Sequence, residues 1–299
     1  MREEYDVIVV GAGPAGSIAA RTACDGCEVL LIEKRQEIGA PVRCAEAVAK
    51  EKLSTFLPLQ KRWIANEIHR SRVFAPDGTV IDLPEEIIRD NIGVILERKL
   101  FDRELARRAA LAGAQLMVRT RATGLIADKG AVRGVKLNRL GEDFERSSKV
   151  VIGADGIESQ VGRWGGINTT LALKDIESCA QYHMENVDVD ETSCDFYFGS
   201  ESPGGFRWIF PKGTGAANIG VAVLGSKLND HKRPIDYLNE FVSNIFGGGQ
   251  PIELVMGGAP VSGALPTIIR NGLMLVGDAA RHTEPILGGG TMNAMEGGR

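Results

Sequence analysis

A glycine-rich turn between two apolar runs near the start of the sequence constrains the fold most. Asp6–Val10 is a short run rich in β-branched residues that predicts a buried parallel strand, and it leads into the GAGPAG segment at 11–16. A helical stretch of small residues follows from Ser17 to about Cys24, and a second strand then ends at Glu33. Strand, GxGxxG turn, helix and strand with a terminal acid together predict one βαβ unit that binds a dinucleotide.

Each residue type in this unit has a physical reason. Gly11 permits the tight turn, Gly13 lets the backbone approach a pyrophosphate, and Gly16 lets helix and strand pack closely. The helix N-terminus offers N–H groups and a partial positive charge to the phosphates. Glu33 is placed to accept hydrogen bonds from ribose hydroxyls and to repel a 2′-phosphate, which disfavours NADP. The unit alone leaves NAD and FAD open.

Two later segments extend the pattern. Residues 97–109 predict an amphipathic helix, in which Arg98 and Asp102 are spaced for a cofactor contact or for a simple i,i+4 ion pair. Residues 150–156 predict a strand that leads into a glycine turn at Asp155.

A final strand, residues 272–280, carries Asp278 at its carboxyl end, where parallel sheets bind ligands. Asp278 is placed there to accept a hydrogen bond from a polyol such as a ribityl chain, or it serves as a helix N-cap. Residues 285–294 predict a bare-backbone loop that opens a helix, and its N–H groups suit the O2/N1 edge of a flavin.

These segments together resemble the flavin motifs of the p-hydroxybenzoate-hydroxylase-like superfamily, over nearly the whole chain. The resemblance implies an α/β fold with a Rossmann-like FAD-binding domain, a mixed sheet with helices, and an inserted antiparallel β-sheet domain for the substrate. We expect the flavin domain to comprise residues 1–67, 96–170 and 263–299. The substrate domain then comprises residues 68–95 and 171–262.

Two further stretches, GAPVRCAEA at 39–47 and GFRWIFPKG at 205–213, resemble the geranylgeranyl reductases. That family carries an RC(G/A)E segment beside the flavin and a YxWxFPKG signature near the substrate cavity. Phe206 stands here in place of the tyrosine, so the ring is kept and the hydroxyl is lost. Family members continue into a C-terminal helical region, and we expect that region to be missing here.

The resemblance implies a set of site residues. Those that would hold the cofactor are Gly11, Gly13, Ala15, Gly16, Glu33, Arg43, Cys44, Ala45, Ala47, Arg98, Ala122, Asp155, Gly277, Asp278, Gly289, Gly290 and Thr291. Those that would line the substrate cavity are Phe206, Trp208, Phe210 and Pro211. Cys44 is the candidate catalytic residue, as a proton relay, a redox partner or a packing residue.

The aromatic residues agree with an apolar substrate. In an extended strand Phe206, Trp208 and Phe210 fall on one face, because side chains alternate. They would wall a long hydrophobic cavity or form the core between two layers. An isolated isoprenoid double bond is not polarised, so we expect a hydride from reduced flavin to be matched by a proton on the other carbon, in a water-poor cavity.

Composition sets limits on partners. A net charge of −4 argues against a nucleic-acid partner, and no apolar stretch approaches the ~20 residues needed to span a bilayer. The start of the sequence shows no signal peptide, so we expect a cytoplasmic protein that contacts a membrane peripherally to reach its lipid. Cys24 and Cys27 have no second pair to complete a zinc site, and no metal is expected.

Three functions remain open at this point. The leading one is an FAD-dependent reductase of isoprenoid double bonds, supplied with electrons by an external nicotinamide, deazaflavin or ferredoxin-type donor, since no second GxGxxG occurs. An FAD-dependent aromatic-ring monooxygenase shares the flavin motifs. A flavin- or lipid-binding fragment without turnover is the third.

Overall fold

The computed structural model describes residues 2–88, 92–228 and 232–299, which divide into two compact units. Unit 1 comprises Met1–Ala40, Lys99–Leu171 and Pro260–Arg299. Unit 2 comprises Pro41–Arg98 and Ala172–Ala259. Among the described residues, no helix has the length and apolar character that crossing a membrane requires.

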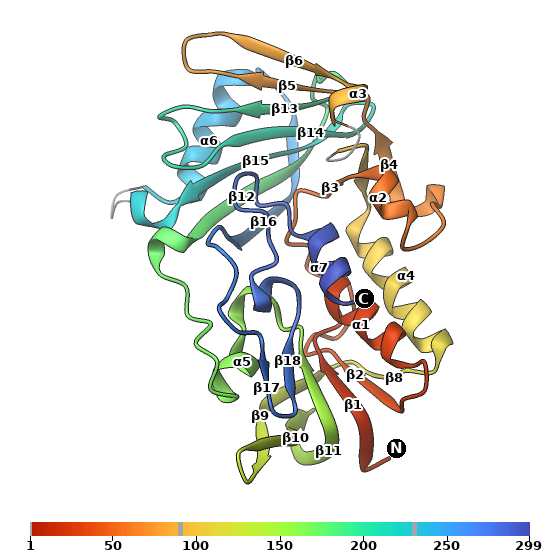
Figure 1. The fold of residues 1–299 in the computed structure, drawn as a ribbon. Coiled ribbons are helices and arrows are strands. Elements are labelled where there is room, and N and C mark those ends of the chain that lie inside the picture. The colour runs from red at the N-terminus through yellow and green to blue at the C-terminus, as the bar shows by residue number, and fades with distance from the viewer. Residues whose placement is uncertain (1, 89–91, 229–231) are drawn as a thin grey trace. The chain divides into compact units, whose positions relative to one another are not determined.

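Unit 1 is built on a mixed sheet in the strand order β17-β18-β11-β1-β2-β8, with β10 paired to β11 and β9 to β10 (Figure 1). Its strands are β1 (Glu4–Val10), β2 (Val29–Ile32), β8 (Gln115–Met117), β9 (Thr120–Asp128), β10 (Ala131–Arg139), β11 (Glu142–Gly153), β17 (Ile269–Arg270) and β18 (Leu273–Leu275). Strands β8, β2, β1, β11 and β18 run parallel, and the β9–β10–β11 ladder and the β17–β18 pair are antiparallel.

The apolar run at the start of the chain lies at the centre of this sheet. Val7 pairs with Val29 on one side and with Val150 on the other, and residues 7–10 are buried. A strand flanked by parallel neighbours and covered on both faces requires a continuous apolar sequence. The predicted buried parallel strand is therefore confirmed.

Helices cover this sheet, and α1 and α7 pack against each other (Figure 1). The helical elements of unit 1 are α1 (Pro14–Ala23), α4 (Arg98–Ala112, whose first residue belongs to unit 2), η2 (Gly156–Glu158), α5 (Gln160–Trp164), η5 (Gly277–Ala280) and α7 (Thr291–Gly297). Phe101, Leu105 and Ala109 form the buried face of α4, as their spacing predicts. The first helix begins at Pro14 rather than at Ser17, because proline is preorganised for the first helical position.

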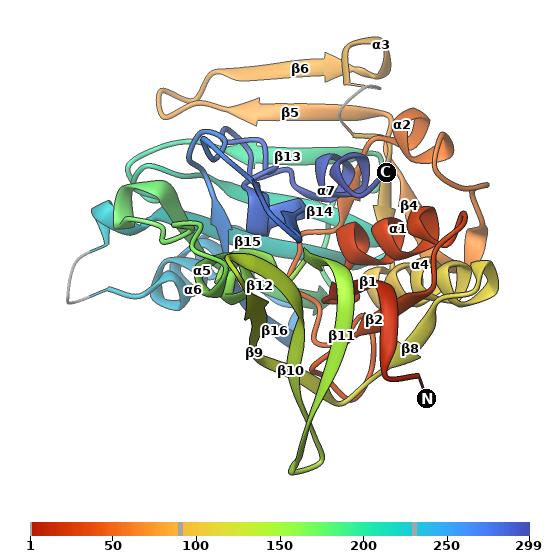
Figure 2. The ribbon, with the colours of Figure 1, turned by 60° about the horizontal axis from the view of Figure 1, so that its bottom comes forward.

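Unit 2 is built on a sheet in the order β16-β12-β15-β14-β13-β5-β6, with β5 and β6 side by side at one edge (Figure 2). Its strands are β5 (Arg70–Phe74), β6 (Val80–Pro84), β12 (Ile176–Glu185), β13 (Ser193–Tyr197), β14 (Arg207–Gly213), β15 (Ala216–Leu224) and β16 (Gln250–Pro260). Strand β12 pairs antiparallel with β15, β15 with β14, β14 with β13, and β5 with β6. Strand β13 pairs with β5 in parallel. A smaller sheet joins β3 (Ala47–Val48), β7 (Val94–Leu96) and β4 (Ile64–Glu67).

The helix α6 (Pro234–Ile245) packs on β12 and β15. Its Tyr237, Leu238 and Phe241 are buried with Ile219 and Val221 in the core between helix and sheet. Short helical segments complete the unit: α2 (Lys50–Ser54), η1 (Lys61–Trp63), α3 (Glu85–Ile88), η3 (Leu173–Asp175) and η4 (Gly225–Lys227).

The boundaries of the two units differ from the predicted domains. Residues 41–67, which the sequence assigns to the flavin domain, belong to unit 2. The reason is strand pairing, because β3 and β4 pair with β7 on either side of it. The assignment of unit 1 to the cofactor and unit 2 to the substrate stays a prediction.

Candidate active site

The glycine turn of unit 1 is packed so tightly that two of its glycines admit no side chain. Gly11 has a φ of +107°, and a Cβ there would lie 2.3 Å from the carbonyl oxygen of Ala154. A Cβ on Gly16 would lie 1.8 Å from the carbonyl oxygen of Gly11. The turn therefore presses β1 and α1 against the end of β11.

Gly13 differs from its neighbours, because the space beside it is open. It has an ordinary φ of −72°, and a Cβ there would meet no atom of the described residues within 4 Å. The N-terminus of α1 carries no side-chain cap, and Pro14 begins the helix. The fold does not require glycine at this position, whereas a pyrophosphate that contacts the backbone would require it.

Glu33 lies against this turn. Its Oε2 accepts a hydrogen bond from the amide of Ala12 at 3.1 Å, and its Oε1 accepts one from the amide of Arg35 at 2.9 Å. The carboxylate that ends β2 therefore reaches the start of the glycine turn, where the fingerprint places the ribose of a dinucleotide.

Asp155 follows Ala154 on the same side of the turn. Its Oδ2 accepts the amide of Val161 at 3.0 Å, whereas its buried Oδ1 accepts no hydrogen bond from the described residues. Burial raises the pKa of this carboxyl above its ordinary value of 3.8. A buried oxygen without a donor fits a hydroxyl of a bound cofactor.

The third predicted segment reaches the same helix. Gly277 has a φ of +67°, and a Cβ there would lie 2.8 Å from the Cβ of Ala15 in α1. Asp278 accepts a hydrogen bond from the Thr283 hydroxyl at 2.9 Å, and a Cβ on Gly290 would lie 3.1 Å from its Oδ1. Gly277 therefore packs against α1, and Asp278 lies beside Gly290 at the start of α7.

The remaining predicted residues of unit 1 lie in two places. Gly289 and Thr291 flank Gly290, and Thr291 begins α7. Ala122 lies in β9, pairs with Leu137 and packs on the core of the sheet. The open space at Gly13, the uncapped helix and the unpartnered oxygen of Asp155 together fit the pyrophosphate and polyol of FAD.

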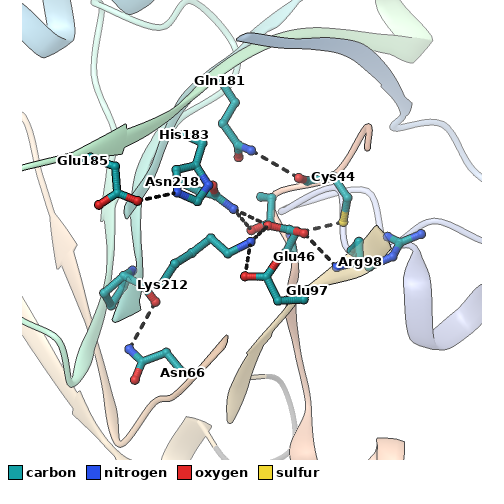
Figure 3. A network of polar contacts seen from close by, with 12 residues as sticks. Cys44, Glu46, Asn66, Glu97, Arg98, Gln181, His183, Glu185, Lys212 and Asn218 are labelled. Carbon is teal, nitrogen blue, oxygen red and sulfur yellow. Dashed lines mark hydrogen bonds and ion pairs between the residues drawn. The ribbon is translucent and has the colours of Figure 1, made fainter. Parts of the chain in front are cut away.

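The Cys44 segment belongs to unit 2, where polar side chains of the sheet hold it (Figure 3). Gln181 of β12 donates to the carbonyl of Cys44 at 3.3 Å, and Asn218 of β15 donates to the carbonyl of Ala45 at 3.3 Å. The amide of Glu46 donates to the Sγ of Cys44 at 3.2 Å. Cys44 is half-buried.

Glu46 is the centre of this network. Its Oε1 accepts the amide of Arg98 at 2.9 Å, at the start of α4. Its Oε2 accepts Lys212 Nζ and Asn218 Nδ2, both at 2.7 Å. Its backbone has a φ of +77°, a left-handed conformation that costs a residue other than glycine about 1 kcal/mol. The contacts of the carboxylate compensate for that strain.

Lys212 lies between two carboxylates. Its side chain is only 4% exposed, and its Nζ contacts Glu97 Oε1 at 3.0 Å as well as Glu46. Burial alone would lower the pKa of the ammonium, but the charges and hydrogen bonds of Glu46 and Glu97 outweigh it and raise the pKa above 10.5. Glu46 and Lys212 thus form a buried ion pair.

The predicted aromatic residues gather in unit 2. Phe206, Trp208 and Phe210 are each 5% exposed and share one buried cluster with Phe196 of β13. The ring centroids of Phe206 and Trp208 are 5.5 Å apart, and those of Trp208 and Phe210 are 6.2 Å apart. Trp208 Nε1 donates to Gln181 Oε1 at 3.0 Å, so the cluster is hydrogen-bonded to the side chain that holds Cys44.

Other predicted residues of unit 2 surround these. Arg43 is exposed, Ala47 begins β3, and the carbonyl of Pro211 accepts a hydrogen bond from Asn66 at 3.1 Å. The sequence pattern assigns no role to Glu46 or Lys212, although they lie in the two stretches that resemble the geranylgeranyl reductases. One signal was available: Lys212 follows the aromatic residues at a spacing of two, so a charge falls on an apolar face and requires a buried partner.

Comparison with known proteins yields two matching family models. Residues 175–259 match the geranylgeranyl reductase catalytic domain, and residues 9–56 match an NAD(P)-binding Rossmann-like domain. A digeranylgeranylglycerophospholipid reductase of Methanosarcina mazei is 54% identical over 302 residues, covering 100% of this chain and 74% of that protein. One from Methanocella arvoryzae is 54% identical over 301 residues, with 100% and 76% covered.

Solved structures agree. A geranylgeranyl bacteriochlorophyll reductase-like protein from Thermoplasma acidophilum is 45% identical with a TM-score of 0.94, covering 99% of this chain and 76% of that one. A flavin-dependent brominase at 20% identity and a TM-score of 0.79 shares the fold alone, over 99% of this chain and 77% of its own. Fold and site define an oxidoreductase with a Rossmann-like, FAD-binding architecture. The chain belongs to the geranylgeranyl reductase family, together with the digeranylgeranylglycerophospholipid reductases.

Proposed function

We propose that this chain is an FAD-dependent reductase that saturates isoprenoid double bonds in the geranylgeranyl chains of membrane lipids. The observation that carries the proposal is the 54% identity to digeranylgeranylglycerophospholipid reductases over the whole chain. The open space beside Gly13 supports a bound dinucleotide.

Residues of unit 1 would hold the cofactor. The amides at the N-terminus of α1 would bind the pyrophosphate, and Glu33 would accept hydrogen bonds from the ribose. Asp155 and Asp278 offer carboxylate oxygens to the polyol, and the amides near Gly290 would face the flavin edge. When bound and reduced by the external donor, the flavin of FAD would supply the hydride that adds to one carbon of the double bond.

Residues of unit 2 would complete the reaction. Saturation also requires a proton on the other carbon, and Cys44 is the proposed group that delivers it, taking a proton from solvent afterwards. Phe206, Trp208 and Phe210 would wall the prenyl chain and exclude water, which protects a cation-like transition state from side reactions. Phe206 does so without the hydroxyl of the family's tyrosine.

Two partners follow from this chemistry. Electrons must enter from an external donor, which we propose to be a reduced nicotinamide, a deazaflavin or a ferredoxin-type protein that docks transiently. The lipid must leave a bilayer, so the protein would contact a membrane surface peripherally.

An anaerobic incubation tests this function. The protein is loaded with FAD, reduced with dithionite and mixed with a geranylgeranyl glycerophospholipid. The molecular mass of the lipid is then measured by mass spectrometry. The expected product gains only hydrogen, and admitting oxygen adds no oxygen atom to it. Hydroxylation of an aromatic substrate, coupled to oxygen consumption, would support a monooxygenase instead. Bound FAD with no lipid turnover would overturn the reductase and leave a binding protein.

A further inference from the structure

Every polar atom of Glu46 has a partner, and together these partners fix the geometry of Cys44. The carboxylate accepts three hydrogen bonds, from the backbone amide of Arg98 and from the side chains of Lys212 and Asn218. The backbone carbonyl accepts the amide of Leu96 at 2.9 Å. The backbone amide is left to donate to Cys44 Sγ at 3.2 Å.

The amide of Glu46 donates back to the side chain two residues earlier, and the backbone that continues from this amide is left-handed. A φ of +77° is sparsely populated for a glutamate, and such conformations persist where their surroundings impose them. Here the carboxylate contacts impose it, because they come from three separate parts of unit 2: Arg98 at the start of α4, Lys212 in β14 and Asn218 in β15 (Figure 3).

We propose that Glu46 is a positioning residue for Cys44: its carboxylate, held by Lys212, Asn218 and the amide of Arg98, fixes the backbone whose amide orients the Cys44 thiol. This rests on the proposed function in one respect, since the consequence for turnover requires that Cys44 acts in the reaction. The geometric claim stands on the contacts of unit 2 alone.

Glu46→Gln breaks this arrangement with little change of shape. A carboxylate suits a site in which both oxygens face donors, whereas a glutamine must direct its NH₂ group at the amide of Arg98 or at Lys212 and Asn218. At least one contact is lost in either orientation. The matched control is Glu104→Gln, since Glu104 is another buried glutamate, bound to Arg108 at 2.8 Å within α4.

The first readout does not need turnover. The rate at which iodoacetamide alkylates Cys44 in the full chain is measured at pH 7 by peptide mass spectrometry. Because the amide of Glu46 holds the Cys44 sulfur in one orientation, we expect Glu46→Gln to slow the alkylation of Cys44 about tenfold. Glu104→Gln should leave the rate unchanged. An unchanged rate in folded Glu46→Gln would overturn the proposal.

The second readout is a double-mutant cycle on kcat of the FAD-loaded enzyme. Glu46→Gln should lower kcat about tenfold with KM unchanged, and it should have no further effect in a Cys44→Ala background. Equal losses in both backgrounds would indicate a purely structural role and overturn positioning. Full kcat in Cys44→Ala would also overturn it, while leaving the reductase function intact.

A milder variant covers the case in which Glu46→Gln does not fold. Asn218→Ser removes the contacts with the Ala45 carbonyl and Glu46 Oε2 but keeps the ion pair with Lys212. We expect a smaller slowing of Cys44 alkylation, about threefold. No slowing in folded Asn218→Ser contradicts the proposal. A wild-type protein that reduces no lipid, with alkylation slowed as expected, would refute the proposed function alone.

Discussion

The glycine turn of unit 1 and the Glu46 network of unit 2 are two ways of building a site. The turn consists of backbone, and its geometry is set by where no side chain fits, at Gly11 and Gly16. The network joins the charged side chains of Glu46, Glu97 and Lys212 with the side-chain amide of Asn218 and the backbone amide of Arg98, and its geometry is set by hydrogen bonds.

The difference lies in how each responds to change. A backbone site fails when an atom is added, because close packing leaves no room. A network of buried charges fails when an atom is removed, because a charge is left without its partner. The predictions below use this contrast, from the largest expected effect to the smallest.

Gly16→Ala should be the most damaging change in the turn. Its Cβ would lie 1.8 Å from the carbonyl oxygen of Gly11, so α1 must move away from β1. We expect the free energy of unfolding to fall by about 3 kcal/mol or more, measured by urea denaturation.

Gly13→Ala is its control within the same motif. Because nothing lies within 4 Å of the new Cβ, the free energy of unfolding should change by less than about 0.5 kcal/mol. FAD affinity should nevertheless fall about tenfold or more, since the methyl group occupies the pyrophosphate approach. If Gly16→Ala and Gly13→Ala lower the free energy of unfolding equally, the proposed difference between the two glycines is wrong.

Lys212→Met tests the network by removal. The variant keeps most of the side-chain volume but leaves Glu46 as a buried carboxylate without its cation. We expect a loss of about 3 kcal/mol in the free energy of unfolding. Adding Glu46→Gln to it should recover part of that loss, because the uncompensated charge is then gone. A loss below about 1 kcal/mol would mean that the pair is dispensable.

Trp208→Phe probes the link between the aromatic cluster and the Cys44 segment. It removes the donor to Gln181 Oε1, and Gln181 is only 4% exposed. An acceptor that loses its buried partner should lower the free energy of unfolding by about 1.5 kcal/mol. Trp164→Phe, at a residue 39% exposed, is the control and should cost little. If Trp208→Phe and Trp164→Phe lower the free energy of unfolding equally, the hydrogen bond from Trp208 to Gln181 contributes nothing to stability.

The free energy of unfolding should also depend on pH through a buried thiol of unit 2. Burial, aided by the nearby Glu177 carboxylate, raises the pKa of the Cys179 thiol in unit 2 from 9.0 to about 12. The folded state keeps a proton that the unfolded state releases, so this contribution to stability is intact below pH 9 and is lost as pH rises toward 12. We expect Cys179 to contribute about 1 kcal/mol to the loss at pH 10, and Cys179→Ala should remove that part and leave the part from the buried Cys194 thiol, whose pKa is also raised. If the free energy of unfolding falls equally steeply with pH in Cys179→Ala, the pH dependence belongs to other groups.

The sequence predicted the backbone site better than the network, for a physical reason. A glycine turn between strand and helix is specified by consecutive residues, so Gly11, Gly16 and the buried strand were recognisable at once. Only the start of α1 was misplaced, because Pro14 begins it. Asp278 was predicted at the end of a strand over residues 272–280, but β18 ends at Leu275 and Asp278 lies in the short helix η5, after Gly277 turns the chain with a φ of +67°.

The network could not be predicted in the same way. Glu46 meets Lys212 and Asn218 only because β14 and β15 pair across the sheet, and no local pattern encodes that meeting. The compact units differ from the predicted domains for a similar reason, since β3 joins unit 2 by pairing with β7, residues 94–96. The roles of Cys44 and of the aromatic residues stay predictions, supported by the geometry around them.

A single-turnover experiment tests the central claim most directly. The FAD-loaded protein is reduced without oxygen and mixed with a geranylgeranyl lipid, and the visible absorbance of oxidised flavin is followed. We predict that the absorbance returns in proportion to the double bonds saturated. A flavin that stays reduced beside the lipid, and recovers its colour only when oxygen enters, would contradict the account.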